Sequence, residues 1–286
     1  MDIISKLRNW RSGMCLGRYS GAEPLKTSFR EAWIDSPRGY GLYAHIHEPA
    51  APGTYPGVVF VPGANSSGTD YDRGVGLKAA DVASCGFVVL HYDPSGRGRS
   101  GGQEDYWGPV HQEELSSVVA FFSRLKEVDR KRIGILSFSI GIIIASGALA
   151  NYPMDDVKYI FDWEGPSNRF NTTRNDTHEP LRGFPTSDDG FWDLREAARF
   201  IGRIRCGYFR YQAEVDHMQG ANKDHAIELI KNAQKGTALW TRCNDNPEGA
   251  VFDEKSPGKY RWVPESLNHK GQMIRYLSEI NAALGH

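Results

Sequence analysis

The 286-residue chain has little cysteine and no excess of basic charge. Its four cysteines, Cys15, Cys85, Cys206 and Cys243, form no C-x-x-C pair, which argues against a disulfide framework and a zinc knuckle. The 34 Lys and Arg residues face 35 Asp and Glu residues, and the net charge of −1 provides no basic field to attract phosphates. We therefore expect no nucleic-acid partner.

Long apolar runs are missing as well. The most apolar helix-like stretch, residues 140–150, is far shorter than the roughly 20 residues that cross a bilayer, and the N-terminus shows no apolar core followed by a small-residue cleavage site. We expect no membrane association and a cytoplasmic location. With 40% hydrophobic and 24% charged residues, the composition is that of a folded globular protein.

Strands and helices alternate along the chain. Residues 28–35 and 41–47 flank the turn signal Ser36-Pro37-Arg38-Gly39, which predicts an antiparallel hairpin with one wet face. Later runs are short, continuously apolar and separated by helical stretches, which is typical of a parallel sheet. These strands are expected at 58–61, 87–92, 133–136, 159–161, 208–211 and 238–241, and the helices near 71–84, 110–127, 140–151, 220–234 and 268–283.

The connection between the sixth and seventh strands is unusually long. About forty residues, near 166–205, lie between them, far more than the usual few residues of such a connection. We interpret this segment as a lid inserted into a single domain over 27–286, which follows an N-terminal extension over 1–26.

One strand, turn and helix can carry chemistry. The strand 133–136 runs into Ser137-Phe138-Ser139-Ile140-Gly141 and then into a helix. A sharp turn here strains its central residue, requires small neighbours at 137 and 141, and places Ser139 at the carboxyl edge of the sheet, near the N–H groups of the helix start. We expect Ser139 to be a nucleophile. The plainer alternative is that Ser137 and Ser139 only end a strand and cap the next helix.

At these residues the sequence resembles the α/β-hydrolase family, whose nucleophile turn reads G-x-S-x-G; Ser137 replaces the first glycine. The loop 93–102 also resembles a turn common after the fourth strand in this family, including its dienelactone-hydrolase-like and serine-peptidase-like branch. The resemblance covers roughly 27–284. It implies the α/β-hydrolase fold, with a mostly parallel central sheet, an antiparallel N-terminal hairpin, helices on both faces and a small lid after the sixth strand.

The resemblance also implies a Ser-His-Asp triad in the chain order nucleophile, acid, histidine. Asp216 follows the strand 208–211 and takes the acid role, and His269 opens the last helix and takes the base role. Asp162 and Glu164, which close the sixth strand, stay open as alternative acids, with Glu214 as a third.

Further site residues follow from the same resemblance. The backbone N–H groups of Ile140 and Ala64 are the expected oxyanion-hole donors. Proline stands at position 62, where many relatives carry histidine, so other groups must hold this loop, with Asn65 or the neighbouring serines as candidates. We expect substrate-binding side chains at Trp163, Phe191 and Trp192, with Trp107 as another wall; the aromatic residues of the insert have the alternative role of pinning the lid to the body.

No cofactor or metal is expected. His45 and His47 share one face of the hairpin, but no third ligand follows at a sensible spacing, and His91 belongs to a buried strand. The leading hypothesis is a serine hydrolase that cleaves a small-molecule carboxylic ester through an acyl-enzyme. A peptidase or amidase of the same fold and a hydrolase-like binding protein are the alternatives, and homo-oligomerisation stays open.

Overall fold

The computed structural model describes residues 24–64, 66–73 and 77–285. Eight strands form one sheet in the order β1-β2-β4-β3-β5-β6-β7-β8. β2 pairs antiparallel with both β1 and β4, and the remaining pairs are parallel, which confirms the predicted hairpin and parallel sheet. The strands are β1 Thr27–Asp35, β2 Gly41–Pro49, β3 Tyr55–Val61, β4 Val88–Tyr92, β5 Val128–Phe138, β6 Val157–Trp163, β7 Gly207–Tyr211 and β8 Thr241–Cys243.

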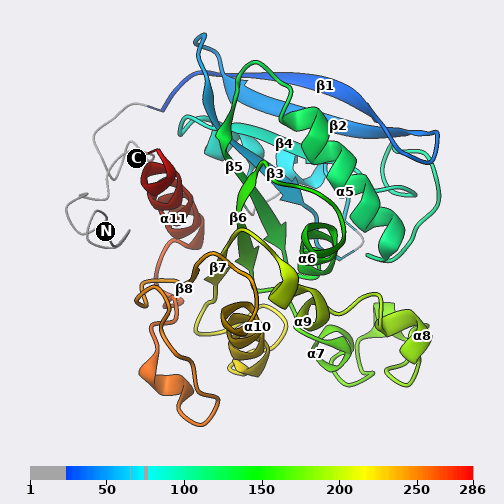
Figure 1. Cartoon of the computed structure of the whole chain (residues 1–286), viewed down its shortest axis with the longest axis vertical. Helices are drawn as coiled ribbons and strands as arrows, with labels where there is room; N and C mark the ends of the chain where they lie inside the picture. The colour runs from blue at the N-terminus through cyan, green and yellow to red at the C-terminus, as the bar shows by residue number, and fades with distance from the viewer. Residues whose placement is uncertain (1–23, 65, 74–76, 286) are drawn as a thin grey trace.

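Helices cover both faces of the sheet. In Figure 1, α5 and α6 lie on one side of it and α11 on the other. Ile135 packs in the apolar cluster that contains α5 and α6, whereas Leu136 packs in the cluster that contains α11. Strands buried on both faces are continuously apolar for this reason. The helices are α3 Asp70–Arg73, α4 Ala79–Ala83, α5 Pro109–Phe122, α6 Gly141–Asn151, α7 Arg169–Thr173, α8 Asp189–Trp192, α9 Ala197–Phe200, α10 Asp224–Lys235 and α11 His269–Leu284, with 3₁₀ turns at Glu179–Leu181, Ile201–Arg203 and Pro257–Lys259.

Two predicted elements differ from the structure. The single helix expected at 71–84 is replaced by the short helices α3 and α4, which flank residues 74–76 outside the described part; the glycines at 74 and 76 disfavour a continuous helix. The last strand begins at Thr241 rather than at 238. Leu239 and Trp240 already bond to the backbone of Cys206 and Tyr208, but the paired register begins at Thr241, and Leu239 is 73% exposed.

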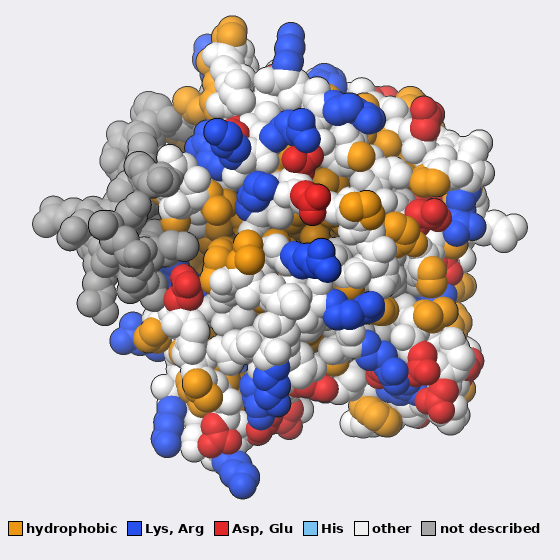
Figure 2. Space-filling model, viewed as in Figure 1, with side chains coloured by type: hydrophobic (Ala, Val, Ile, Leu, Met, Phe, Trp, Pro, Cys, Tyr) orange, Lys and Arg blue, Asp and Glu red, His pale blue; other side chains and the backbone are white. Residues whose placement is uncertain are grey.

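The long connection between β6 and β7 contains α7, α8 and α9; Figure 1 shows α9 beside α10 and α8 farther away, at the right of the view. Arg169 in α7 is buried and donates to Glu196 and Asp193, so it holds this connection together. Of the predicted extension 1–26, residues 1–23 lie outside the described part. No helix among the described residues is both long and apolar enough to cross a bilayer. Figure 2 shows basic and acidic side chains interspersed on one face of the molecule.

Candidate active site

Ser139 stands in a strained turn directly after β5. Its backbone φ is +51°, a conformation that L-residues with side chains rarely adopt, and its N–H donates to the carbonyl of Trp163 at 2.8 Å. A Cβ atom on Gly141 would lie 2.7 Å from the carbonyl oxygen of Pro62, so a small residue is needed there, as the sequence predicts. The predicted sharp turn between strand and helix is confirmed.

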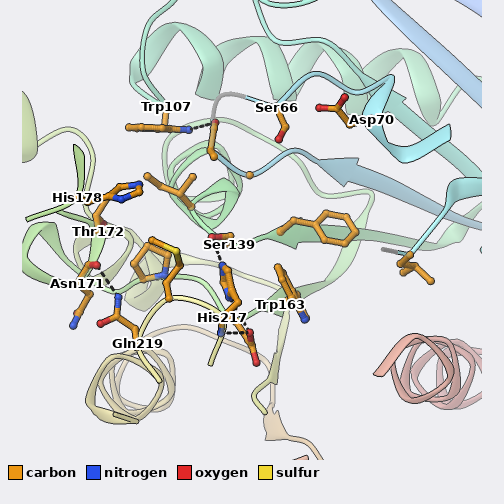
Figure 3. Close-up of a pocket in the computed structure, with 18 of the residues that line it drawn as sticks. Ser66, Asp70, Trp107, Ser139, Trp163, Asn171, Thr172, His178, His217 and Gln219 are labelled. Atoms are coloured by element: carbon orange, nitrogen blue, oxygen red, sulfur yellow. Dashed lines mark hydrogen bonds and ion pairs between the residues drawn. The ribbon is translucent and has the colours of Figure 1, made fainter. Parts of the chain in front are cut away.

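His217 is the ring that contacts Ser139. Its Nε2 lies 2.9 Å from the Ser139 hydroxyl oxygen, and its Nδ1 lies 2.8 Å from an oxygen of Glu164 (Figure 3). Because a carboxylate only accepts hydrogen bonds, Nδ1–H donates to Glu164, and Nε2 is left to accept from the hydroxyl of Ser139. The described residues thus contain a continuous serine, histidine and carboxylate chain.

Glu164 is held in place from several sides. It follows β6 with a φ of +52° and only 4% of its surface exposed. Besides the His217 ring, its oxygens accept from the backbone N–H groups of His217 at 3.2 Å and Ala213 at 2.9 Å. These bonds link the end of β6 to the loop after β7, which orients the imidazole toward Ser139.

The prediction that His269 contacts Ser139 is wrong. His269 begins α11, and its Nδ1 lies 2.8 Å from the Tyr211 hydroxyl. It lines the same pocket as Ser139, but His217 takes the hydrogen bond to the serine. The reason is the tight loop after β7: Asp216 and Gly220 exchange two backbone hydrogen bonds, and this turn brings residue 217 over the end of β5.

Asp216 anchors this loop instead of pairing with the base. Its carboxylate accepts from the N–H groups of Met218 at 2.7 Å and Gln219 at 2.8 Å, and from the side chains of Gln212 and His225. Burial alone would raise the pKa of the Asp216 carboxyl, but the hydrogen bonds from His225 and Gln212 outweigh it and hold this pKa well below its usual range. One Asp216 oxygen lies 3.5 Å from Nδ1 of His217, whereas Glu164 lies at 2.8 Å.

The other carboxylates weighed from the sequence lie elsewhere. Asp162 is fully buried and accepts from Arg210 at 2.6 Å and from the Tyr208 hydroxyl at 2.8 Å, so it balances a buried cation. Glu214 is exposed to solvent. Of the alternative acids left open by the sequence, the structure brings Glu164 to His217.

The sequence signal that could have found His217 is the one used for Asp216: both residues follow a parallel strand at its carboxyl end.

The two expected oxyanion donors lie beside Ser139. Ile140 precedes α6, where the first N–H groups have no carbonyl one turn earlier to bond. Ala64 follows β3 with a φ of +41°, and a Cβ on Gly63 would lie 3.2 Å from the Cβ of Ser139, so the two loops are in close approach. Asn65, weighed as a support for this loop, lies outside the described residues.

The loop after β4 supports Ala64. Arg97 Nη1 donates to the Ala64 carbonyl at 2.7 Å, and the indole N–H of Trp107 donates to it at 2.9 Å. Glu104 accepts two hydrogen bonds from the Arg97 guanidinium and fixes its direction. The buried carboxylate of Asp93 accepts from the N–H of Gly68. The loop after β4 and Trp107 therefore hold the Ala64 loop in place.

A cavity of about 780 Å³ opens above Ser139. Trp163 lines it and stacks on the ring of His217, with centroids 4.5 Å apart. Trp107 also lines it, as expected. Phe191 and Trp192 do not belong to the lining: Phe191 stacks on Phe184, and Trp192 is fully buried. Their predicted role in binding substrate is therefore wrong, because these rings pack the connection between β6 and β7. The remaining lining is mostly apolar and includes Tyr71, Leu77, Phe138, Leu181, Met218 and Met273.

Two groups of side chains among the described residues have the donor atoms for a metal ion. One is Glu164, Asp216 and His217, whose atoms already make the hydrogen bonds above. The other is His45, Asp72 and His91, which lines no part of this cavity.

No protein-family model matches the sequence. A segment of 67 residues is 43% identical to the uncharacterized protein PA2218 of Pseudomonas aeruginosa, covering 23% of this chain and 18% of that protein. Among solved structures, a puromycin-hydrolyzing peptidase of Mycobacterium tuberculosis superposes with a TM-score of 0.63 at 16% identity, over 91% of this chain and 39% of that one. The Pyrococcus furiosus esterase Pf2001 superposes with a TM-score of 0.61 at 14% identity, over 90% of this chain and 92% of that one.

The chain has the α/β-hydrolase fold. Within this α/β-hydrolase fold, Ser139 follows β5, Glu164 follows β6 and His217 follows β7. All three stand at the carboxyl edge of the sheet, where ligands bind in open sheets of this kind.

Proposed function

We propose that this chain is a serine hydrolase that cleaves carboxylic esters through an acyl-enzyme. The observation that carries the proposal is the hydrogen-bonded chain from Ser139 through His217 to Glu164. A serine hydroxyl is a poor nucleophile until a base takes its proton, and the base needs an anion that fixes its tautomer. Here the anion is Glu164, which follows β6, whereas the sequence suggests Asp216, which follows β7.

The reaction proceeds in two halves. The Ser139 Oγ attacks the ester carbonyl carbon while Nε2 of His217 takes the hydroxyl proton, and Glu164 stabilises the resulting imidazolium. The tetrahedral intermediate collapses, the bond to the alcohol oxygen breaks, and His217 returns the proton to the leaving alcohol. Water then attacks the acyl carbon with His217 as base, and Ser139 leaves with that proton as the carboxylic acid is released.

The negative oxygen of each tetrahedral intermediate is assigned to the N–H groups of Ile140 and Ala64. Preorganised donors at this position lower the barrier by several kcal/mol. The bonds from Arg97 and Trp107 to the Ala64 carbonyl support this role, because they hold the backbone of Ala64 in place beside Ser139.

The cavity favours an ester with an apolar acyl or alcohol part. Its walls are largely aromatic and aliphatic, and apolar walls bind apolar groups and exclude water. Aminopeptidases of this fold need free carboxylates for a substrate amino terminus. Glu164 is committed to His217 and Glu214 is not among the lining residues, which leaves Asp70 as the lining carboxylate that a substrate amino terminus could meet.

A peptidase or amidase is the second candidate. A similar solved structure is described as a peptidase, and an amide requires only that His217 protonate an amine leaving group. Membership of the dienelactone-hydrolase-like branch stays a prediction, since the similar structures are described as peptidases and an esterase. The intact hydrogen-bond chain argues against a non-catalytic binding protein.

A fluorophosphonate probe and a Ser139→Ala variant test the proposal. We expect the wild-type protein to incorporate one probe on the peptide that contains Ser139, and the variant to incorporate none and to lose p-nitrophenyl ester turnover by at least about 10³-fold. Ser187→Ala, an exposed serine outside the pocket lining, is the matched control and should keep both. Undiminished ester turnover by Ser139→Ala overturns the proposal, and faster turnover of aminoacyl anilides than of esters assigns the amidase reaction instead.

A further inference from the structure

Three histidines from two strands converge on one aspartate, apart from the pocket of Ser139. His45 and His47 lie on one face of β2, and His91 pairs with His45 in the register of β4. Asp72, in α3, points at all three. We call these four residues the histidine cluster. None of them lines the cavity, although Asp70 and Tyr71 of the same short helix do.

The polar atoms of the cluster are close together. Asp72 Oδ2 lies 2.6 Å from Nδ1 of His45, and Asp72 Oδ1 lies 2.8 Å from Nε2 of His47 and 3.0 Å from Nε2 of His91. The donor atoms of His45, Asp72 and His91 all lie within 4.8 Å of one another. Three imidazole nitrogens thus share one carboxylate.

The cluster is shielded from solvent and supported by a neighbouring side chain. The exposed fractions of the side chains are 9% for His45 and His47, 1% for His91 and 20% for Asp72. The second nitrogen of His45 lies 2.7 Å from the Tyr43 hydroxyl. Metal-binding histidines use their other ring nitrogen in this way, because the second hydrogen bond fixes the tautomer and the ring orientation.

We propose that the histidine cluster binds a divalent transition-metal ion, with Zn²⁺ as the best match. His45, His91 and Asp72 supply three ligands of the kinds that Zn²⁺ prefers, and His47, whose Nε2 lies 2.8 Å from Asp72, is positioned to complete the usual four. Metal–ligand bonds of about 2.0–2.1 Å in a tetrahedron place ligand atoms about 3.3 Å apart. The present nitrogen–oxygen contacts with Asp72 are 2.6–3.0 Å, shorter than this spacing, so the carboxylate and the rings must move apart when the ion enters.

The ion has a structural consequence for the pocket. It joins α3 to β2 and β4, and α3 contributes Asp70 and Tyr71 to the wall of the cavity. Tyr71 also packs against Phe138, the residue before the nucleophile, with ring centroids 4.5 Å apart. A bound ion thus fixes one wall of the pocket without entering the reaction. Sequence spacing alone hides the site, because His91 and Asp72 lie far from the hairpin in the chain.

The test uses the full chain, treated with EDTA and then dialysed into chelator-free buffer. Isothermal titration calorimetry with Zn²⁺ should show one binding site per chain. Zn²⁺ should also raise the thermal unfolding midpoint of the protein. Co²⁺ at the same site should give the intense visible absorption of a tetrahedral ion. His47→Gln and His91→Gln should each weaken Zn²⁺ binding at least tenfold, while His269→Gln, a matched histidine outside both groups, should bind as the wild type does.

His217→Gln separates the two groups of donor atoms. If this variant keeps one Zn²⁺ per chain, the ion belongs to the histidine cluster; if it alone loses the ion, the ion sits beside Glu164 and the proposal is wrong. Should His91→Gln fail to fold, anomalous scattering at the zinc edge from wild-type crystals locates the ion without any substitution. Absence of saturable Zn²⁺ and Co²⁺ binding by the wild-type protein also overturns the proposal.

Discussion

Replacing Glu164 by Gln tests which carboxylate serves His217. In the structure, Glu164 accepts from the imidazole at 2.8 Å and from two backbone N–H groups. Gln has nearly the same shape and keeps one acceptor oxygen, but its NH2 group must face one of the buried donors, so the fold should survive with some loss of stability. What it loses is the negative charge that stabilises the imidazolium in the transition state and selects the Nδ1–H tautomer of His217.

The magnitude follows from the role of the acid in such triads. Exchanging the acid for its amide lowers kcat by about 10⁴-fold when it is the direct partner of the histidine. Asp216 remains 3.5 Å from the same nitrogen and retains part of the electrostatic stabilisation. We therefore expect a decrease of about 10³- to 10⁴-fold for Glu164→Gln, which corresponds to about 4 to 5.5 kcal/mol of barrier.

Asp216→Asn should behave differently, because this carboxylate mainly supports its own loop. The new amide group would face the donors on Gln212 and His225, and leaving such buried groups without acceptors costs about 2 to 4 kcal/mol of unfolding free energy. We expect a thermal midpoint lower by roughly 5 to 15 °C and a decrease in kcat of only about tenfold, since its oxygen lies beyond hydrogen-bond distance of the ring.

The assay is the initial rate of p-nitrophenyl ester hydrolysis, measured well below the unfolding midpoint of each variant and alongside thermal unfolding. Glu214→Gln, an exposed carboxylate of the same loop, is the control and should change neither quantity. The reasoning is refuted if Glu164→Gln keeps wild-type kcat while a fully folded Asp216→Asn loses it by 10³-fold or more.

Three further predictions follow from other parts of the structure. His217→Gln should lower ester kcat by at least about 10³-fold. His269→Gln should lower kcat by no more than about tenfold, since the His269 ring bonds Tyr211. If steady-state kinetics give the larger loss to His269→Gln, His269 is the base, as the sequence predicts. Gly63→Ala should lower stability by roughly 1 to 3 kcal/mol in urea unfolding and also lower kcat, because its Cβ would lie 2.6 Å from the Phe138 carbonyl oxygen; an unchanged midpoint and rate contradict the close approach. Burial lowers the pKa of His111 to about 4, below its value in the unfolded chain. The neutral ring therefore contributes about 3 kcal/mol to the free energy of unfolding above about pH 6.5, and this contribution is lost as the pH falls toward 4. Equal pH dependence of unfolding in His111→Gln and wild type would falsify this.

Local patterns in the sequence were enough to predict the architecture and the strained turn at Ser139. Apolar runs of strand length, separated by helical stretches, predict the parallel sheet because each strand must bury both faces. The turn at Ser139 is equally local: its small neighbours are needed by atoms one or two residues away, and Gly141 meets the carbonyl of Pro62 as expected. The prediction of Ser139 therefore rested on five consecutive residues and on their position after a strand of the predicted sheet.

The partners of Ser139 and the histidine cluster depended on tertiary structure. Asp216 and His217 are neighbours in sequence, and only the closed turn after β7 decides that the ring reaches Ser139 while the carboxylate faces inward. Likewise, β4 and α3 bring His91 and Asp72 to His45. Sequence determines which groups are present at each strand end, but the direction of a side chain depends on loop closure and on contacts between distant segments, which a linear pattern does not encode.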